Sequence, residues 1–174
     1  MTDIIVRLRK IRMLAMDVDG VMTDCSTTLA ADGEWQRGFC IRDGYGIVML
    51  NKTGYQTAVI TASKAKDIQE RVHVLGIHHY HPGNINKKTE LEELLKKTKL
   101  TPSEVAYIGD DLFDIPVLRS VGFAATVPEA MGEVFPFVHY TTKRNGGDGA
   151  VREICDMILQ YGPLGTHVWD QHFR

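Results

Sequence analysis

The sequence predicts an α/β fold in which a parallel sheet carries helices on both faces. Short apolar runs alternate with amphipathic segments of helical length from about residue 11 to residue 161, and this alternation is typical of strands joined by helical crossovers. A chain of 174 residues can bury a substantial core as one domain. We therefore expect one domain over residues 1–174, with a hairpin over about 25–40 and an irregular tail over about 162–174.

The first strand of the sheet is predicted at residues 11–16, an apolar run that ends in Asp17-Val18-Asp19-Gly20. Residues two apart in a strand point the same way, so the two carboxylates would aim at one place beyond its carboxyl end. Open α/β sheets bind ligands at that end. Two close carboxylates repel each other, and a divalent cation would cancel the repulsion. Taken alone, the tetrapeptide is equally well a strand that enters an Asp-Gly turn.

The segment that follows is predicted as a β-hairpin, because Asp32-Gly33 lies between two extended segments, 26–30 and 34–40. Glycines and apolar periodicity then predict a helix from about 42 to 52, a strand over 55–60, a helix over 65–75 and a short strand over 77–80. Thr61 would follow directly on the second of the buried strands.

The remainder of the chain continues the alternation. A helix with a leucine stripe is predicted over 87–97, and Thr101-Pro102-Ser103-Glu104 has the form of a capping box that opens one helical turn. We then expect a strand over 105–108, a helix to about 120, a strand over 123–126, a short helix near 131 and a strand over 137–141. Gly146-Gly147-Asp148-Gly149 would open a last helix over 150–161.

Composition excludes several classes of function. The net charge is −2 with acidic and basic residues interspersed, which gives no electrostatic footprint for nucleic acid or an anionic membrane. The three cysteines lack any CxxC spacing, so neither a disulfide framework nor a zinc site is indicated. No segment has the length of a signal peptide or a membrane span, and we expect a cytoplasmic protein. His78, His79 and His81 have no partnered ligand spacing and are expected to be surface imidazoles.

Three more positions at strand ends or helix starts carry groups suited to phosphate chemistry. Thr61 offers a hydroxyl to a phosphate oxygen, and Lys87 offers a cation at the start of a helix. Gly109-Asp110-Asp111-x-x-Asp114 follows the strand over 105–108 and adds carboxylates. Each has an ordinary explanation when taken singly: a turn threonine, a solvated lysine and an acidic helix start.

Taken together and in this order, these features resemble the motifs of the haloacid dehalogenase (HAD) superfamily of phosphotransferases. The resemblance implies a nucleophilic aspartate that forms an aspartyl-phosphate, a second aspartate that acts as general acid and base, and a hydroxyl and a cation that bind the phosphoryl group. The residues in these roles would be Asp17, Asp19, Thr61 and Lys87.

The resemblance also implies a magnesium site. Mg²⁺ would be held by Asp17, Asp110 and the backbone carbonyl of Asp19, in agreement with its preference for oxygen ligands and retained waters. Asp111 and Asp114 would act through water or from behind the ligands.

Spacing indicates that the cap domain of many superfamily members is missing. Between Asp19 and Thr61 there is room for the hairpin and one helix, and between Lys87 and Asp110 for one helix and a turn. A member without a cap acts on a large exposed substrate or has its site closed by another subunit, because exclusion of water strengthens the electrostatics of the reaction.

Over about residues 11–159 the chain is similar to the 3-deoxy-D-manno-octulosonate 8-phosphate (KDO 8-phosphate) phosphatase family. The segments that carry this resemblance are the Asp17 motif, the hairpin, Arg42-Asp43-Gly44-Tyr45-Gly46-Ile47, and residues 146–153. It implies a homotetramer that releases KDO from a small phosphorylated acid sugar for lipopolysaccharide synthesis. The substrate contacts implied are Cys40, Ile41, Arg42, Asp43, Gly44, Arg71 and Lys87.

Two departures from this family leave alternatives open. Val48 and Ser63 stand where the family commonly has arginine, and Ala62 where it has glycine, although Lys64 could reach the site. The same framework would serve a phosphatase of nine-carbon acid-sugar phosphates. Other readings are a phosphatase of polynucleotides or phosphoproteins, and a non-catalytic HAD-like binding domain, against which the complete set of polar groups counts.

Overall fold

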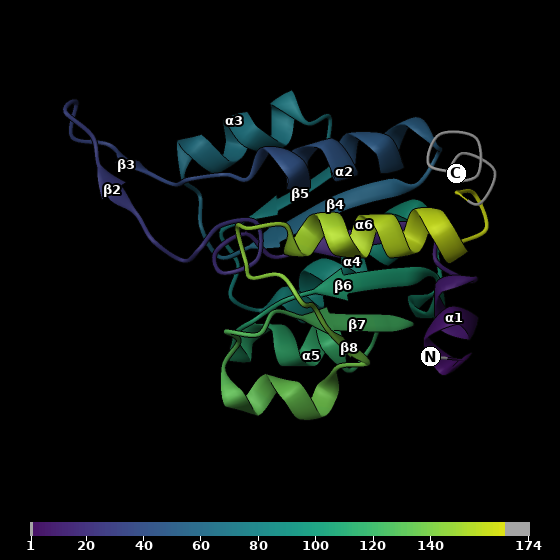
Figure 1. Ribbon diagram of the computed structural model, residues 1–174. Helices are drawn as coiled ribbons and strands as arrows, with labels where there is room; N and C mark the ends of the chain where they lie inside the picture. Colours follow the sequence, from purple (N-terminus) through teal and green to yellow (C-terminus); the bar gives the residue numbers. More distant parts are fainter. Residues whose placement is uncertain (1, 166–174) are drawn as a thin grey trace.

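Six parallel strands form one sheet with helices on both faces in the computed structural model, which describes residues 2–165 (Figure 1). The strand order is β5-β4-β1-β6-β7-β8, and a separate two-stranded sheet is made by β2 and β3. The predicted α/β fold is therefore confirmed. The elements are α1 (Thr2–Leu8), β1 (Met13–Met16), β2 (Thr28–Leu29), β3 (Trp35–Gln36), α2 (Ile41–Lys52), β4 (Gln56–Thr61), α3 (Lys66–Val74), β5 (His79–Pro82), α4 (Lys87–Thr98), β6 (Val105–Ile108), α5 (Ile115–Leu118), β7 (Phe123–Thr126), β8 (Tyr140–Thr141) and α6 (Ala150–Tyr161), with 3-10 turns at Pro102–Glu104, Leu112–Asp114 and Gly132–Phe137.

Strand β1 lies at the centre of the sheet and all four of its side chains are buried. Its last residue, Met16, pairs with Val59 of β4 on one side and with Ile108 of β6 on the other. The carboxyl ends of three neighbouring strands are thereby aligned. This register brings the residues after β1, β4 and β6 to one edge of the sheet, where α/β folds bind ligands.

Two layers of helices cover the sheet. Helices α2 and α6 pack against each other on one face, and α4 and α5 contact each other on the other face (Figure 1). The apolar side chains of α6 that are buried recur at helical spacing, at Val151, Ile154, Cys155, Ile158 and Leu159, as expected of a helix that buries one stripe against a sheet. The predicted range of this helix, 150–161, is confirmed.

The hairpin of β2 and β3 projects away from the body of the molecule, at the upper left of Figure 1. Each strand has two residues, fewer than the extended segments predicted, and all four side chains are exposed. Leu29 and Trp35 are 56% and 59% exposed. Such a short ribbon has little to stabilise it within one chain.

Other differences from the prediction lie at the edges of the sheet. The short strand expected over 77–80 occupies His79–Pro82, and the strand expected over 137–141 is reduced to Tyr140–Thr141. A 3-10 turn over Gly132–Phe137 precedes it and takes in the first residue of the predicted strand. Helix α1 was not predicted; it has only seven residues, and Leu8 is the residue that it buries.

Two further predictions concern membrane spans and the C-terminal tail. Across residues 2–165, no helix combines the length and the apolar character that a membrane crossing requires. Most of the tail predicted to be irregular over about 162–174 lies outside the described residues.

The glycine-rich segment before α6 packs directly on the loop that follows β1. Gly147 donates its backbone N–H to the carbonyl of Val21 at 3.0 Å. A methyl group on Gly146 would collide with the backbone carbonyl oxygen of Gly20, and Gly149 has a φ of +106°. The role of these glycines in this structure is thus close backbone approach beneath the loop that carries Asp17 and Asp19.

We expect Gly146→Ala to destabilise the protein by ~1–3 kcal/mol, because a backbone oxygen cannot move aside as a flexible side chain can. Gly132→Ala is the matched control, since no atom lies within 4 Å of a methyl group built there, and its effect should stay within about 0.5 kcal/mol. Urea unfolding of both variants measures the difference. Equal stability of the two variants would contradict the packing argument.

Candidate active site

Several predicted site residues line one cavity of about 180 Å³ at the carboxyl edge of the sheet. They come from the ends of β1, β4 and β6 and from the first turn of α4, which explains why residues far apart in sequence meet. The residues lining the cavity are Asp17, Asp19, Cys25, Thr61, Ala62, Lys87, Asp110, Asp111 and Phe113.

A buried ion network forms the floor of this cavity. The ammonium group of Lys87 lies 2.8 Å from Asp17 Oδ2 and 2.7 Å from Asp114 Oδ1. The Lys87 side chain is 3% exposed and that of Asp17 is 9% exposed. Burial disfavours a charged lysine, but the two carboxylates outweigh it and raise the Lys87 pKa. One cation therefore serves two buried carboxylates.

Asp114 is the fixed member of this network. Besides Lys87, its carboxylate accepts hydrogen bonds from the Tyr107 hydroxyl and from the backbone N–H groups of Asp110 and Asp111, both at 3.0 Å. Four donors match the four lone-pair positions of a carboxylate. Asp114 is thus saturated by the protein, and it holds both the lysine and the loop that presents Asp110.

Asp110, unlike Asp114, has a carboxylate oxygen without a hydrogen-bond partner. Its Oδ1 atom is buried and has no hydrogen-bond partner. Burial and then the nearby Asp114 raise the Asp110 pKa to about 7. A methyl group at Gly20 would collide with the Asp110 carboxylate, so the glycine of the Asp17-x-Asp19-Gly20 motif is what lets this side chain lie across the loop.

The acidic cluster fits a divalent cation. One carboxylate oxygen from each of Asp17, Asp110 and Asp114 lies within 4.8 Å of the others. Burial, followed by the repulsion of Asp114, raises the Asp17 pKa to about 8 despite the opposing effect of Lys87. Because Asp114 is saturated, Asp17 and the unpartnered oxygen of Asp110 are the carboxylates open to a cation. Oxygen donors of this kind suit Mg²⁺.

Asp19 lies at the rim of the cavity and is held by a residue that sequence reasoning missed. Arg37 Nε donates to Asp19 Oδ1 at 2.6 Å, and Arg37 also pairs with Asp67 at 3.2 Å. In the sequence, Arg37 is one more charged residue at the end of a hairpin. Only the path of the hairpin back toward β1 brings the two together, so no local pattern could have indicated this contact.

Thr61 is buried at the end of β4, where its hydroxyl oxygen accepts a hydrogen bond from the backbone N–H of Ser63 at 3.1 Å. A hydroxyl can accept and donate at once, so this contact does not use the O–H donor of Thr61. Thr61 therefore lines the same cavity as Asp17, which follows β1, and Lys87, which begins α4.

The predicted substrate residues other than Lys87 do not line this cavity. Asp43 is 2% exposed and accepts hydrogen bonds from the backbone N–H groups of Gly149 and Arg152, at the start of α6. Arg71 donates to the carbonyl of Cys40 at 3.1 Å, while its Nε is buried without a partner. The predicted substrate segment is the N-cap and first turn of α2, namely Cys40, Ile41, Arg42, Asp43 and Gly44. Within this chain it contacts α3 through Arg71 and α6 through Asp43, and its substrate role stays a prediction.

The histidine expectation is wrong for two of the three side chains. His79 and His81 are half-buried, and His81 Nδ1 lies 2.8 Å from Glu90 of α4. His79 Nε2 lies 2.8 Å from the Gln56 side chain. Helix α4 supplies the partner of His81 and strand β4 that of His79, which sequence spacing did not reveal.

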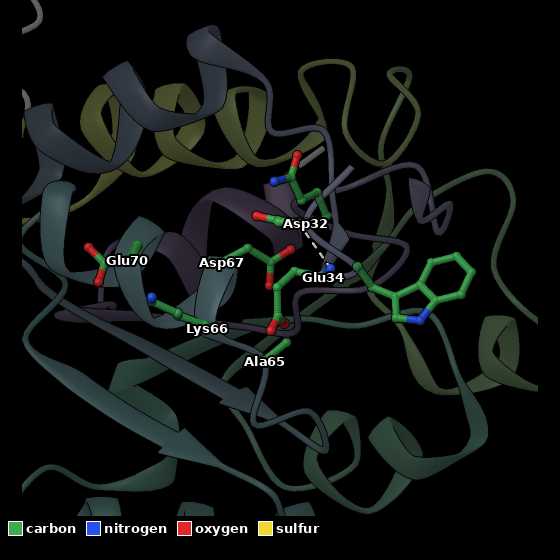
Figure 2. Close-up of a pocket in the computed structure, with 8 residues that line it drawn as sticks. Asp32, Glu34, Ala65, Lys66, Asp67 and Glu70 are labelled. Atoms are coloured by element: carbon green, nitrogen blue, oxygen red, sulfur yellow. Dashed lines mark hydrogen bonds between the residues drawn. The ribbon is translucent and has the colours of Figure 1, made fainter. Parts of the chain in front are cut away.

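A second hollow lies between the hairpin and α3 (Figure 2). Four of its lining side chains are acidic and one is basic, namely Asp32, Glu34, Asp67, Glu70 and Lys66. Its charge is unsuited to a phosphorylated substrate. Asp67, one of its walls, is the residue that contacts Arg37.

Comparison with known proteins decides the family. Residues 75–154 match the model of haloacid dehalogenase-like hydrolases. The chain is 44% identical to the 3-deoxy-D-manno-octulosonate 8-phosphate phosphatase KdsC of Yersinia pestis, over 90% of this chain and 84% of that protein. This chain belongs to the KDO 8-phosphate phosphatase family. The family resemblance predicted from the motifs is therefore confirmed, and the family member from Escherichia coli K12 is 41% identical over the same shares.

Solved structures of the family agree with the fold. The KDO 8-phosphate phosphatase of Moraxella catarrhalis, solved with a magnesium ion, a phosphate ion and KDO, superposes with a TM-score of 0.93 at 34% identity, over 98% of each chain. The Yersinia pestis enzyme gives a TM-score of 0.89 at 43% identity, over 91% of this chain and 86% of that one. These two family members thus share the fold of this chain along nearly its whole length.

Proposed function

We propose that this protein is a magnesium-dependent phosphomonoesterase that hydrolyses KDO 8-phosphate to KDO and phosphate. The observation that carries the proposal is the buried Asp17 carboxylate at the floor of the cavity, paired with Lys87 and next to the unpartnered oxygen of Asp110. The Moraxella catarrhalis relative binds magnesium, phosphate and KDO, which supports the same ligands here.

Asp17 and Asp19 would divide the chemistry. An Asp17 oxygen attacks phosphorus while the bond from phosphorus to the sugar oxygen breaks, and Asp19 gives its proton to that leaving oxygen. Asp19 then takes a proton from a water molecule that attacks the aspartyl-phosphate, and phosphate and the Asp17 carboxylate are released. Lys87 and Thr61 bind the oxygens of the phosphoryl group throughout.

Mg²⁺ would be held by Asp17, Asp110 and the backbone carbonyl of Asp19. When bound, it neutralises the charge that otherwise keeps the nucleophile and the anionic phosphoryl group apart. The pKa values of Asp17 and Asp110 are raised in the protein alone, because burial and the nearby Asp114 disfavour their charged forms when no cation balances them.

Substrate choice depends on cations near the cavity. Ser63 stands where the family commonly has arginine, and its hydroxyl oxygen accepts the backbone N–H of Ala65 at 3.2 Å. Lys64 packs its aliphatic stem on Gly83, where a methyl group would collide with it. Lys64 is exposed and packs on the turn after β5, and its single ammonium group cannot replace the two-pronged contact of a guanidinium. A nine-carbon acid-sugar phosphate is the second candidate substrate on this ground.

A panel of purified phosphosugars tests the proposal. With magnesium, KDO 8-phosphate should show a kcat/KM well above those of nine-carbon acid-sugar phosphates, hexose phosphates and nucleotides, and chelator should abolish turnover. A lost charge-assisted contact to a carboxylate corresponds to roughly ten- to a hundred-fold in kcat/KM. Equal rates on all substrates, or a clear preference for a nine-carbon acid sugar, would overturn the substrate assignment.

The assembly belongs to the proposal as well. By family resemblance the protein would be a cytoplasmic homotetramer that serves lipopolysaccharide biosynthesis. Subunit association is supported by Leu29 and Trp35, which are exposed on a hairpin that the described part of the chain leaves uncovered. An exposed pair of large apolar side chains on such a ribbon is typical of a contact surface. Sedimentation at micromolar concentration should give the mass of a tetramer, and a fully active monomer would contradict the assembly.

In chelator, we expect the stability of the protein to fall as the pH rises from about 4 to about 8. Burial and Asp114 raise the pKa of Asp17 from 3.8 to about 8 and that of Asp110 from 3.8 to about 7. Over this range the native state keeps protons that the unfolded chain has released, and stability falls with pH wherever the native state binds more protons. Thermal unfolding across this range measures the slope.

Asp110→Asn should make that slope shallower, because an amide does not titrate. Asp32→Asn, on the exposed hairpin tip, is the control and should keep the slope of the wild type. If Asp110→Asn leaves the pH dependence of stability unchanged, the Asp110 carboxyl does not have a raised pKa in the native state.

A further inference from the structure

Arg37 connects the hairpin to the predicted acid and base of the reaction. Its Nε donates to Asp19 Oδ1 at 2.6 Å and its Nη2 to Asp19 Oδ2 at 3.3 Å. Two parallel bonds from a planar guanidinium fix the orientation of a carboxylate as well as its charge. The Arg37 side chain is 10% exposed and that of Asp19 is 38% exposed, so the arginine holds Asp19 from the protein side and leaves it open toward the cavity.

Asp67 holds Arg37 in turn. Arg37 Nη1 lies 3.2 Å from both carboxylate oxygens of Asp67, and the backbone N–H of Arg37 donates to Asp67 Oδ2 at 3.0 Å. Asp67 is in the first turn of α3 and also accepts from the backbone N–H of Ile68 at 2.8 Å. Figure 2 shows this carboxylate between α3 and the hairpin residue Glu34. The chain of contacts thus runs from a packed helix to the rim of the cavity.

The contacts of Arg37 favour a positioning role over a substrate contact. All three of its guanidinium nitrogens donate to protein acceptors, the third partner being the Ser63 hydroxyl at 3.5 Å from Nη2. A guanidinium that recognised a substrate would keep a donor pair directed at solvent. Here Nε and Nη2 are directed at Asp19 and Nη1 at Asp67, and the first of these aspartates has a part in the proposed chemistry.

We propose that Arg37 is a positioning residue that holds Asp19 in the orientation for proton transfer, and that Asp67 holds Arg37 in place. The inference rests on the proposed function, because it assigns the proton transfers to Asp19. It makes the hairpin part of the catalytic apparatus, in addition to any part it has in assembly.

Two substrates with different leaving groups test this role. The alkoxide of KDO 8-phosphate needs the proton of Asp19 as its bond to phosphorus breaks, whereas p-nitrophenolate leaves without one. For Arg37→Gln we expect kcat/KM on KDO 8-phosphate to fall roughly 10- to 100-fold, as for removal of a group that orients a reacting residue. The kcat/KM on p-nitrophenyl phosphate should change little, because it reports only the step up to departure of the leaving group.

Rapid mixing supplies a second readout. Hydrolysis of the aspartyl-phosphate needs Asp19 as a base whatever group has left, so it should slow in Arg37→Gln with both substrates. With p-nitrophenyl phosphate the variant should then release a burst of about one p-nitrophenolate per active site before its slow steady state. Arg37→Lys keeps the charge without the fork and should resemble Arg37→Gln.

Arg7→Gln is the matched control, because Arg7 also pairs with an aspartate, Asp3 at 2.9 Å, but does so in α1 and away from the cavity. It should leave both substrates unaffected. Asp67→Asn leaves the hairpin sequence intact and should show the same selective loss, to a smaller degree. This second variant keeps the proposal testable if Arg37→Gln disturbs folding.

The outcomes test the role of Arg37 separately from the substrate assignment. An equal loss on both substrates without a burst, or no loss on either, would overturn the positioning role of Arg37. If the wild type instead hydrolyses other alkyl phosphates but not KDO 8-phosphate, the substrate assignment fails. The comparison of leaving groups is then made with the alkyl phosphate that is hydrolysed, and it decides the role of Arg37 independently.

Discussion

Asp17→Asn is expected to abolish phosphatase turnover, with a loss of roughly four orders of magnitude or more in kcat. An amide cannot form the aspartyl-phosphate, and the other carboxylate bound to Lys87, that of Asp114, is saturated by four hydrogen bonds and cannot replace it. The fold should survive, since Lys87 keeps its 2.7 Å contact with Asp114. Steady-state kinetics and thermal unfolding measure the two effects.

The control for this variant is Asp32→Asn, which removes an exposed carboxylate at the hairpin tip and should retain full activity. Mass spectrometry of acid-quenched enzyme adds a direct test, because phosphate should be trapped on the wild type and not on Asp17→Asn. Near-normal turnover by Asp17→Asn would reject Asp17 as the nucleophile. In chelator the variant should unfold at the same or a higher temperature, because it removes a buried carboxylate from an over-acidic site.

Lys87→Met is expected to damage both stability and activity. Lys87 is the cation shared by Asp17 and Asp114, and its side chain is 3% exposed. Removing one partner of a buried ion pair leaves uncompensated charge and costs ~3–5 kcal/mol. Activity should fall by roughly 100-fold or more, because the transferring phosphoryl group also loses a preorganised positive charge. Urea unfolding and kcat/KM on the preferred substrate measure the two losses.

Lys88→Met is the matched control for this experiment. Lys88 is the next residue of α4 and is exposed, so its replacement removes the same charge from the same helix turn without touching the cavity. Its stability should stay within about 0.5 kcal/mol of the wild type. If Lys87→Met and Lys88→Met unfold at the same urea concentration, the buried network does not stabilise the fold as described.

The participants in the candidate site were predictable because they follow strands. Asp17, Thr61 and Asp110 each come after an apolar run, and parallel strands place their carboxyl ends at one edge. Lys87 was found by its place at a helix start. Their catalytic roles came from the resemblance to a family and remain proposals until the variants are measured.

Other contacts could not be read from the chain because they depend on how separate elements pack. Asp114 was expected behind the metal ligands, yet its complete burial and its bond to Tyr107 follow from the way the loop after β6 closes under α4. Asp43 was predicted as a substrate contact, and packing of α2 on α6 makes it an acceptor for the start of α6. Residues of these types are ordinary surface residues in a sequence.

The sequence by itself determined the parallel sheet, its first strand and the carboxylates that follow that strand, because apolar periodicity and motif spacing act over short distances along the chain. Only the tertiary structure decided that Arg37 of the hairpin meets Asp19 and Asp67, and that Gly146 lies against Gly20. The physical reason is that a charged fork or a missing methyl group acquires its role from the atoms opposite it. Those atoms are placed by the path of the backbone through space, which no local pattern of residues specifies.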